Sequence, residues 1–129
     1  MRLDKGELLV ESLTKLVKEQ QIKGAWVSGI GGAMWVELGF YDLLNKTYLW
    51  KKLDQVVEVT NLQGNIAWEG DTPIVHLHGT FGDVNMQSVA GHVKELEVAG
   101  TCEVLLHQWY GEGLKRFHSD KIGLKLLDL

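Results

Sequence analysis

The stretch from Pro73 to Val93 reads PIVHLHGTFGDVNMQSVAGHV, and its pattern is typical of a β-rich protein. Its first part, PIVHLHGTF, is rich in apolar and β-branched residues and starts at a proline, where a strand can do without the missing N–H. Polar residues around Asp83 interrupt this run, and SVAGHV then continues it. The spacing predicts two strands joined as a hairpin.

Similar segments lie on both sides of this hairpin. The stretch AWVSGIGGAMWVELGFYD, residues 25–42, is predicted as two strands broken by Gly29, Gly31 and Gly32. The other predicted strands are TYLWKK (47–52), VVEVTNLQGNIAW (56–68), EVAGTCEVLLHQWY (97–110) and the tail IGLKLLDL (122–129). We therefore expect about seven or eight strands in total.

One segment is predicted firmly as a helix, from about Lys5 to Gln20. Asp4 occupies the N-cap position and Glu7 follows three residues later, as in a capping box. Apolar residues then recur on one helical face, and Gly24 is expected to end the helix. These apolar residues are Leu9, Leu13, Leu16 and Val17. The predicted fold class is α+β, with one main N-terminal helix and a large, mostly antiparallel β-sheet.

The length of 129 residues predicts one domain that spans residues 1–129. No apolar run approaches the roughly 20 residues needed to cross a bilayer, and the N-terminal MRLDKGELLVES is too polar for a secretory signal. Cys102 is the only cysteine, so no internal disulfide can form and a buried apolar thiol is expected. These features predict a cytoplasmic protein with no membrane partner.

The formal net charge of −4 bears on the choice of partners. Proteins that bind nucleic acids gather Lys and Arg into a patch or stripe that neutralises phosphates. Here the basic residues are scattered, and the nearest clusters are the pairs Lys51–Lys52 and Lys115–Arg116. The charge therefore argues against DNA as a partner, unless folding or assembly gathers these side chains.

The hairpin also carries the clearest chemical pattern in the sequence. His76 and His78 are two residues apart in a predicted strand, so their side chains point to the same face and can converge on one ion. His92 follows in the second strand, after Gly91, which would let the backbone come close to the first pair. Three imidazoles and a water form a usual arrangement of catalytic zinc. The alternative is that these histidines are hydrogen-bonded to neighbours or half exposed.

Other polar residues carry weaker signals. Asp83 is a candidate to orient one of the imidazoles by a hydrogen bond, and a loop-capping role is its alternative. His107 and His118 have no such companions, so structural or surface roles are expected for them. The stretch SGIGGAM does not match the glycine pattern of dinucleotide-binding loops, so no organic cofactor is expected.

Taken together, these segments resemble the PPC domain, the plants-and-prokaryotes domain, over nearly the whole chain. The matching motifs are RLDKGE followed by a helix, VSGIGGAMWVELGFYD, EVTNLQGNIAW, PIVHLHGTFGD, AGHV and VAGTCEVLL. The resemblance implies a domain with a central, mostly antiparallel sheet that assembles as a trimer. Some free-standing prokaryotic members resemble metalloproteins, with zinc held by a His-x-His pair and a later histidine. Those positions are His76, His78 and His92 in this sequence.

The resemblance also implies partners. Prokaryotic members are labelled predicted DNA-binding proteins, and plant members carry the domain beside AT-hooks in nuclear proteins. This sequence contains no RGRP-like AT-hook. The plant interaction hexapeptide, Gly-Arg-Phe-Glu-Ile-Leu, falls on residues 55–60, where only Glu58 is retained.

Three functions follow as expectations. The first is a free-standing, DNA-binding or regulatory protein of the prokaryotic PPC type with a three-histidine zinc site. The second is a zinc-dependent lyase or hydrolase, by distant analogy with the fold of acetolactate decarboxylase. The third is a metal-stabilised homotrimer that binds a small-molecule ligand. Catalytic residues are not assigned, and the candidates for a supporting acid, base or cation are Glu37, Glu58, Asp83 and Arg116.

Overall fold

The computed structural model describes residues 1–129 and contains eight strands and one helix. The elements, in chain order, are β1 (Arg2–Asp4), α1 (Leu9–Glu19), β2 (Ala25–Asp42), β3 (Thr47–Leu53), β4 (Val57–Glu69), β5 (Thr72–Gly82), β6 (Ser88–Gln108), β7 (Lys115–Ser119) and β8 (Leu124–Asp128). This confirms the expectation of a single helix with a large sheet.

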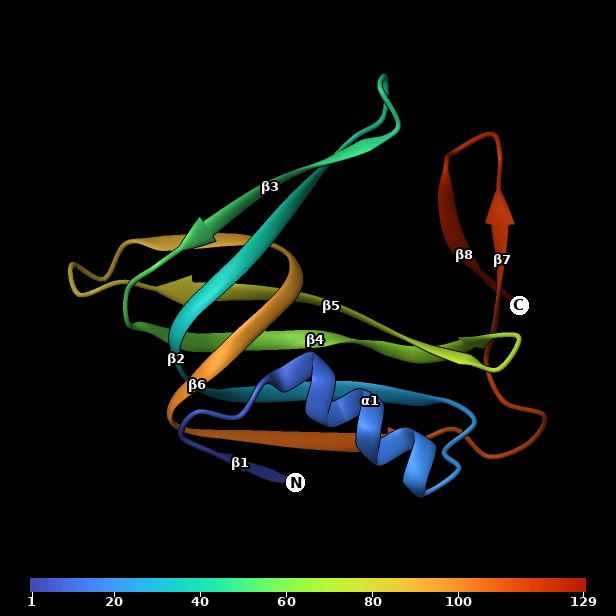
Figure 1. Cartoon of the computed structure of the whole chain (residues 1–129), viewed down its shortest axis with the longest axis horizontal. Coiled ribbons are helices and arrows are strands. Elements are labelled where there is room, and N and C mark those ends of the chain that lie inside the picture. Colours follow the sequence, from blue (N-terminus) through green and yellow to red (C-terminus); the bar gives the residue numbers. More distant parts are fainter.

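All strands belong to one sheet, in the order β3-β2-β6-β5-β4-β7-β8, with β1 beside β6 (Figure 1). Every pairing is antiparallel except the short one between β4 and β7, so the sheet is mixed but mostly antiparallel, as predicted. Because β2 also pairs with β4, the path β2-β6-β5-β4 returns on itself. This closure protects the edges of the central strands.

The predicted break in residues 25–42 is wrong, because β2 runs through all three glycines as one strand. The register with β4 shifts between Gly29 and Gly31, and the register with β6 shifts between Gly31 and Ala33. A β-carbon at Gly31 would lie 2.4 Å from the carbonyl oxygen of Thr101. The glycines thus allow a bulge and a close strand approach, which bend a strand without ending it.

The helix begins four residues later than predicted. Asp4 lies in β1, where it pairs with Thr101, and Gly6 has a φ of 89°, outside the helical region. The Gly6 N–H donates to the carbonyl of Val98, so tertiary hydrogen bonds hold this segment. The Glu7 carboxylate accepts the Asp4 N–H at 2.6 Å, and this part of the predicted capping box stabilises a turn before the helix.

The end of the helix also differs from the prediction. The helix ends at Glu19 with Gln20 as its C-cap, and the chain then turns at Gln21, whose φ is 52°. Gly24 lies beyond this turn and serves packing, because a β-carbon there would lie 2.8 Å from Cγ of Leu114. Gln21, in the left-handed region, therefore ends the helix in place of Gly24.

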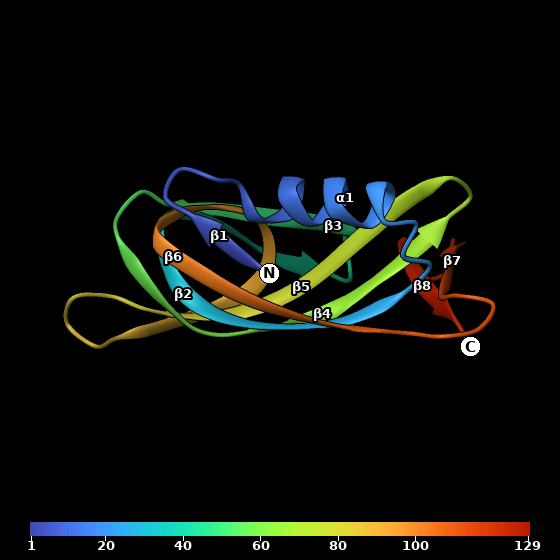
Figure 2. The same ribbon diagram turned by 90° about the horizontal axis from the view of Figure 1, so that it is seen from below.

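Helix α1 lies along one face of the strands and covers the core (Figure 2). Its buried residues Leu9, Leu13 and Val17 confirm the predicted apolar face. The strand side chains that complete the core include Val27, Leu62, Ile66, Leu77, Phe81 and Leu96. Cys102 is also fully buried, as expected. Helix α1 is too short and too polar to span a lipid bilayer.

Two elements that position the site were only partly foreseen. Strand β6 is continuous over Ser88–Gln108, although two separate strands were predicted for this region. Strand β8 confirms the strand predicted in the tail, but its partner β7 was missed. Figure 1 shows the β7–β8 hairpin standing at the end of the sheet, beside β4 and β5.

Candidate metal centre

The pairing register brings the three predicted histidines together on one face of the sheet. His78 of β5 lies directly opposite His92 of β6, and His76 lies two residues along β5 on the same face. The alternate residues Leu77 and Val93 point the other way and are buried in the core. The histidines therefore occupy the face of the sheet that is turned away from α1.

The three imidazoles form a compact cluster. One potential ligand atom from each histidine lies within 4.8 Å of the others. The ring centroids of His76 and His78 are 5.3 Å apart, those of His76 and His92 are 5.1 Å apart, and those of His78 and His92 are 5.4 Å apart. His76 and His92 are half-buried, whereas His78 is exposed. This donor set is one that zinc accepts.

An orphaned polar atom tests whether the residues fit a metal ion. Nδ1 of His92 is buried and has no hydrogen-bond partner in the protein. Buried polar atoms of this kind nearly always have a partner, because leaving one unpaired costs free energy. A ligand that binds at the histidine cluster would supply that partner. The residues present therefore fit a bound metal ion.

Two of the three histidines, His76 and His92, have lowered pKa values. Burial, together with the nearby Arg116 and His78, lowers the pKa of His76 to about 4. Burial, followed by the charges of His76, His78 and Arg116, likewise lowers the pKa of His92 to about 4. Both rings are therefore neutral at pH 7, and a neutral imidazole is the form that binds metals.

Glycines let neighbouring strands come close to the two strands that carry the histidines. A β-carbon at Gly64 of β4 would lie only 1.9 Å from the carbonyl oxygen of His76. Gly91, in contrast, makes room for β2 and not for β5, because its β-carbon would lie 3.1 Å from the carbonyl oxygen of Gly39. The close approach at the first histidine pair thus depends on Gly64, which the sequence had not singled out.

Arg116 is the candidate supporting cation that the fold brings to the histidines. It lies on β7, and its Nη2 is 3.4 Å from Nδ1 of His76. The guanidinium donates hydrogen bonds to Oδ1 of Asn65 at 2.5 Å and to the carbonyl of Lys125 at 2.6 Å. Its Nε is buried without a partner. Arg116 is therefore held in place with its guanidinium beside His76.

The three acidic candidates do not contact the histidines. Glu37 accepts a hydrogen bond from Lys94, and Glu58 lines a separate surface cavity. Oδ1 of Asp83 accepts the backbone N–H groups of Asn85 and Gln87, which is the loop-capping arrangement. A role for Asp83 in orienting an imidazole stays a prediction.

An aromatic wall beside His92 was missed in the sequence. Tyr48 and Trp50 of β3 stack on each other with ring centroids 4.6 Å apart, and the Tyr48 ring lies 4.9 Å from that of His92. Trp50 and His92 both pair with Gly39, on its two sides. The signal was the alternation in TYLWKK, which puts Tyr48 and Trp50 on one face. Gly39 leaves space for this wall, since its β-carbon would lie 2.6 Å from the Trp50 ring.

A cavity of about 560 Å³ opens beside His76 and His92. The β7–β8 hairpin forms its far wall, with apolar residues from β8 and the cations Arg116 and Lys125. No Asp or Glu lines this cavity. His118, for which a structural or surface role was expected, also lines it and lies 3.4 Å from Asp120. His107 is exposed at the other end of β6, as expected.

Comparison with known proteins gave a family match and several close structural neighbours. The sequence model of the Plants and Prokaryotes Conserved (PCC) domain matches residues 1–109. A "putative DNA-binding protein" from Ralstonia eutropha JMP134 is 34% identical, with a TM-score of 0.93, over 100% of this chain and 89% of that chain. No curated protein sequence matches this chain.

Two further solved structures are similarly close. A metal-containing protein from Archaeoglobus fulgidus is 31% identical, with a TM-score of 0.93, over 100% of this chain and 91% of that chain. A plant- and prokaryote-conserved (PPC) protein from Pyrococcus horikoshii is 29% identical, with a TM-score of 0.93, over 100% of this chain and 89% of that chain.

Proposed function

This chain belongs to the Plants and Prokaryotes Conserved domain family, and we propose that it binds a zinc ion at His76, His78 and His92 and a small anionic ligand beside that ion. The cluster of three imidazoles within 4.8 Å carries the proposal. The metal-containing relative from Archaeoglobus fulgidus supports it. Zinc with an open position would act as a Lewis acid towards a carbonyl or carboxylate oxygen.

The charge of the site argues for an anionic ligand. The three imidazoles contribute no negative charge, and the adjacent Arg116 adds a positive one. The cavity lining contains no carboxylate that could balance a divalent cation. A cation that is buried without a counter-charge is costly, so an anion in the cavity would complete the site. Arg116, whose Nη2 lies 3.4 Å from Nδ1 of His76, is the cation that such an anion would meet.

Metal content tests the first half of this proposal. Untagged protein, dialysed without chelator, should contain close to one zinc per chain by plasma mass spectrometry. His78→Ala should lose the metal, and because His78 is exposed, the variant should still fold. His107→Ala, another exposed histidine, is the matched control and should retain it. Equal zinc in both variants, or none in the parent protein, would refute the metal site.

Ligand binding tests the second half. Cobalt(II) can replace zinc, and its visible absorption changes when a ligand enters the coordination sphere. Oxalate, a small dianion, should change this spectrum and saturate. Arg116→Gln should weaken oxalate binding by about tenfold or more, because it removes a charge-assisted hydrogen bond. Lys5→Gln removes an exposed positive charge remote from this cavity and should leave the affinity unchanged. A spectrum that oxalate does not change would exclude the anionic ligand while leaving the metal site intact.

We also propose that the protein is a homotrimer. Large apolar side chains are exposed on the sheet, and Trp26, Ile30 and Leu105 lie on the same face of β2 and β6. Exposed apolar groups of this size are typical of subunit interfaces. Light scattering after size exclusion should give three times the chain mass of 14.5 kDa. Leu105→Lys should lower that mass, and a parent protein that elutes as a monomer would refute the trimer.

Binding to DNA is a second candidate function, favoured by the name of the relative from Ralstonia eutropha. The formal charge of −4 makes it the weaker candidate. If the trimer gathers basic residues, duplex DNA should retain the protein at low salt, and the affinity should fall steeply as salt rises. Absence of salt-sensitive retention at low ionic strength would exclude this function.

A further inference from the structure

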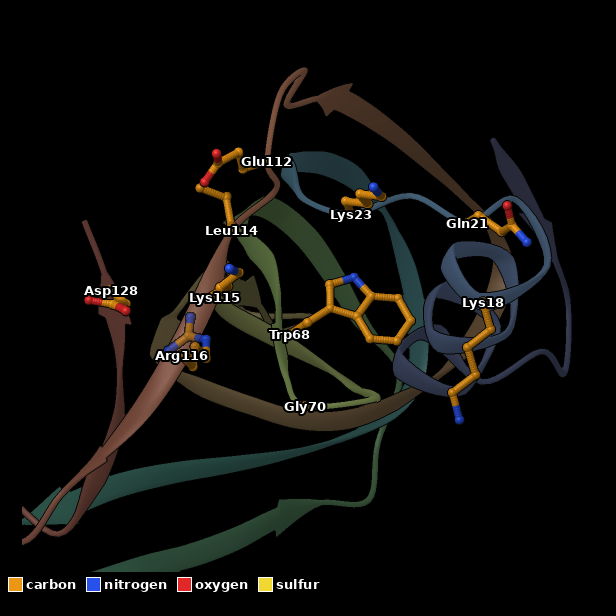
Figure 3. A pocket seen from close by; sticks show the side chains of 10 residues that line it. All are labelled: Lys18, Gln21, Lys23, Trp68, Gly70, Glu112, Leu114, Lys115, Arg116 and Asp128. Carbon is orange, nitrogen blue, oxygen red and sulfur yellow. The ribbon is translucent and has the colours of Figure 1, made fainter.

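A second cavity lies at one end of the sheet, between α1, the turn that joins β4 and β5, and the start of β7 (Figure 3). Its volume is about 560 Å³, which is within the range of small-molecule sites. It is separate from the histidine cluster, and Arg116 is the single residue that lines both cavities. Its chemistry also differs, because it combines an aromatic ring with charges of both signs.

Trp68 forms the aromatic part of this cavity. Figure 3 shows its indole ring face-on in the middle of the lining side chains. The indole N–H donates to the carbonyl of Ile22 at 2.9 Å, so the ring is anchored at its edge. A fixed aromatic ring in a cavity offers a stacking surface for a flat ring, and nucleobases stack on such rings regardless of their sequence.

Cationic side chains surround the indole. Lys18 comes from α1, Lys23 from the segment before β2, and Lys115 from the start of β7. None of these three lysines has an acidic side chain within ion-pairing distance, although other lysines in the chain do. Three unpaired ammonium groups around one cavity favour an anion with several charges, such as a di- or triphosphate.

The pairing of the strands also places a carboxylate, that of Asp128, in line with Trp68 and Lys115. Trp68 of β4 pairs with Lys115 of β7, and Lys115 pairs with Asp128 of β8. These three residues therefore follow one another across the sheet at one level. Glu112 lines the same side of the cavity. A carboxylate would repel phosphate, but it accepts hydrogen bonds from the hydroxyl groups of a ribose, as in other nucleotide sites.

The walls of the cavity are tied together by the backbone. The Leu114 N–H donates to the carbonyl of Lys23 at 3.0 Å, and the Trp68 N–H donates to the carbonyl of Leu114 at 2.9 Å. These bonds connect the segment before β2, the segment before β7 and the end of β4. The cavity therefore exists before a ligand arrives, which lowers the ordering cost of binding.

We propose that this second cavity binds a nucleoside phosphate. The base stacks on Trp68, the ribose hydroxyl groups donate to Asp128 or Glu112, and the phosphates contact Lys18, Lys23 and Lys115. An aromatic ring, a carboxylate and unpaired cations in one cavity match the base, sugar and phosphate of this ligand class. The proposal is independent of the zinc site, because it uses none of the histidines.

Calorimetric titration with ADP tests this assignment. EDTA is present throughout, so that phosphates cannot bind through a metal at the histidines. We expect saturable binding of one ADP per chain, with pyrophosphate at least about tenfold weaker because it lacks the stacked base. Lys18→Glu and Lys115→Glu should each weaken ADP binding by about tenfold or more. Lys51→Glu makes the same charge change at an exposed site elsewhere and should have no effect.

Variants of the indole separate stacking from charge. Trp68→Leu should weaken ADP by about tenfold and leave pyrophosphate unchanged, whereas Trp68→Phe keeps an aromatic face and should lose less. The lysine variants, whose side chains are exposed, keep the test valid if the tryptophan variants do not fold. A short single strand of thymidylate is titrated in parallel. Binding of both ligands with the same sensitivity to Lys18→Glu indicates nucleotides within a strand, and binding of ADP alone indicates a free nucleotide.

Three results would overturn the proposal. The first is the absence of saturable ADP binding to the parent protein. The second is pyrophosphate binding as tightly as ADP, which would mean that the base makes no contact. The third is an equal loss of affinity in Lys51→Glu, which would mean that only the overall charge matters. None of these results bears on the zinc site, since metal content is measured on a separate preparation without EDTA.

Discussion

His92 shows how one residue is given its chemistry by its neighbours. It lies between His78 on β5 and Gly39 on β2, and the Tyr48 ring covers it from the side of β3. Burial lowers its pKa to about 4, and its buried Nδ1 has no partner in the protein. A surface histidine has none of these properties. The lowered pKa and the unpartnered Nδ1 of His92, which suit it to bind a metal, therefore result from its packing between neighbouring strands.

Gly64 should be indispensable for the position of His76. Gly64→Ala adds a β-carbon that would lie 1.9 Å from the carbonyl oxygen of His76, so β4 and β5 must move apart. We expect a loss of about 3 kcal/mol in the free energy of unfolding, measured in urea. The clash is with a backbone atom, which cannot move aside without displacing the strand. Zinc content should fall as well.

A second glycine provides the control for this prediction. Gly100→Ala adds the same methyl group in β6, where nothing lies within 4 Å of it. Its stability should stay within about 0.5 kcal/mol of the parent. If Gly64→Ala behaves like Gly100→Ala, the close approach of β4 to His76 is not required.

Cys102 should be unreactive in the folded protein. It is fully buried, and burial raises the pKa of its thiol, with Glu103 as a further cause, so little thiolate forms at neutral pH. Ellman's reagent should therefore modify less than about one tenth of the chains in native buffer and all of them in urea. Rapid modification under native conditions would show that the β1–β6 region opens.

At the scale of elements, α1 takes its N-terminal cap from a distant strand. No side chain caps the helix from within its own segment, where Leu8 is the N-cap residue. Oε1 of Glu95, on β6, accepts the Val10 N–H at 2.7 Å, and its Oε2 accepts the Glu11 N–H at 3.1 Å. These bonds satisfy donors that every helix start leaves free. They also fix α1 against the sheet that carries His92.

Removal of this cap should cost stability. Glu95→Ala should lower the free energy of unfolding by about 1 kcal/mol or more in urea titrations. Burial raises the pKa of Glu95, which means that the folded state gains little from the negative charge. Glu95→Gln keeps an acceptor oxygen without the charge and should therefore retain most of the stability. Equal losses in the two variants would assign the effect to charge alone.

At the scale of the whole molecule, a bound metal would join β5 to β6. His76 and His78 lie on one strand and His92 on the other, so binding is linked to the closed ring of strands β2-β6-β5-β4. A ligand that binds only the folded state stabilises it by mass action.

Zinc should consequently raise the melting temperature. At 100 times the dissociation constant the gain is about 2.7 kcal/mol, or roughly 10 °C for a chain of this size. Differential scanning calorimetry with and without chelator measures this shift. His78→Ala should melt at the same temperature in both conditions, and a similar shift in that variant would place the stabilising metal elsewhere.

Local patterns in the sequence were enough to predict which side chains share a face and where most of the elements lie. Period-two alternation identified most of the strands and put His76 and His78 on one face. The helical period identified the buried face of α1. The motifs in their order also indicated the family, which the match over residues 1–109 confirms. These features are local, since each depends on side chains a few residues apart in the chain.

Features that depend on pairing between distant segments could not be predicted from local patterns and became visible only in the folded chain. Register set His92 opposite His78 and Asn65 opposite His76, and no local pattern encodes a register. The start of α1 was mispredicted because Asp4 pairs with Thr101 of β6 and so belongs to a strand. The break in β2 was mispredicted because the strand pairing continues on both sides of the bulge. The β7–β8 hairpin brought Arg116 to both cavities from a segment with no clear strand signal. Long-range hydrogen bonds and packing outweigh local propensity at these places, because propensities differ by only about 1 kcal/mol per residue.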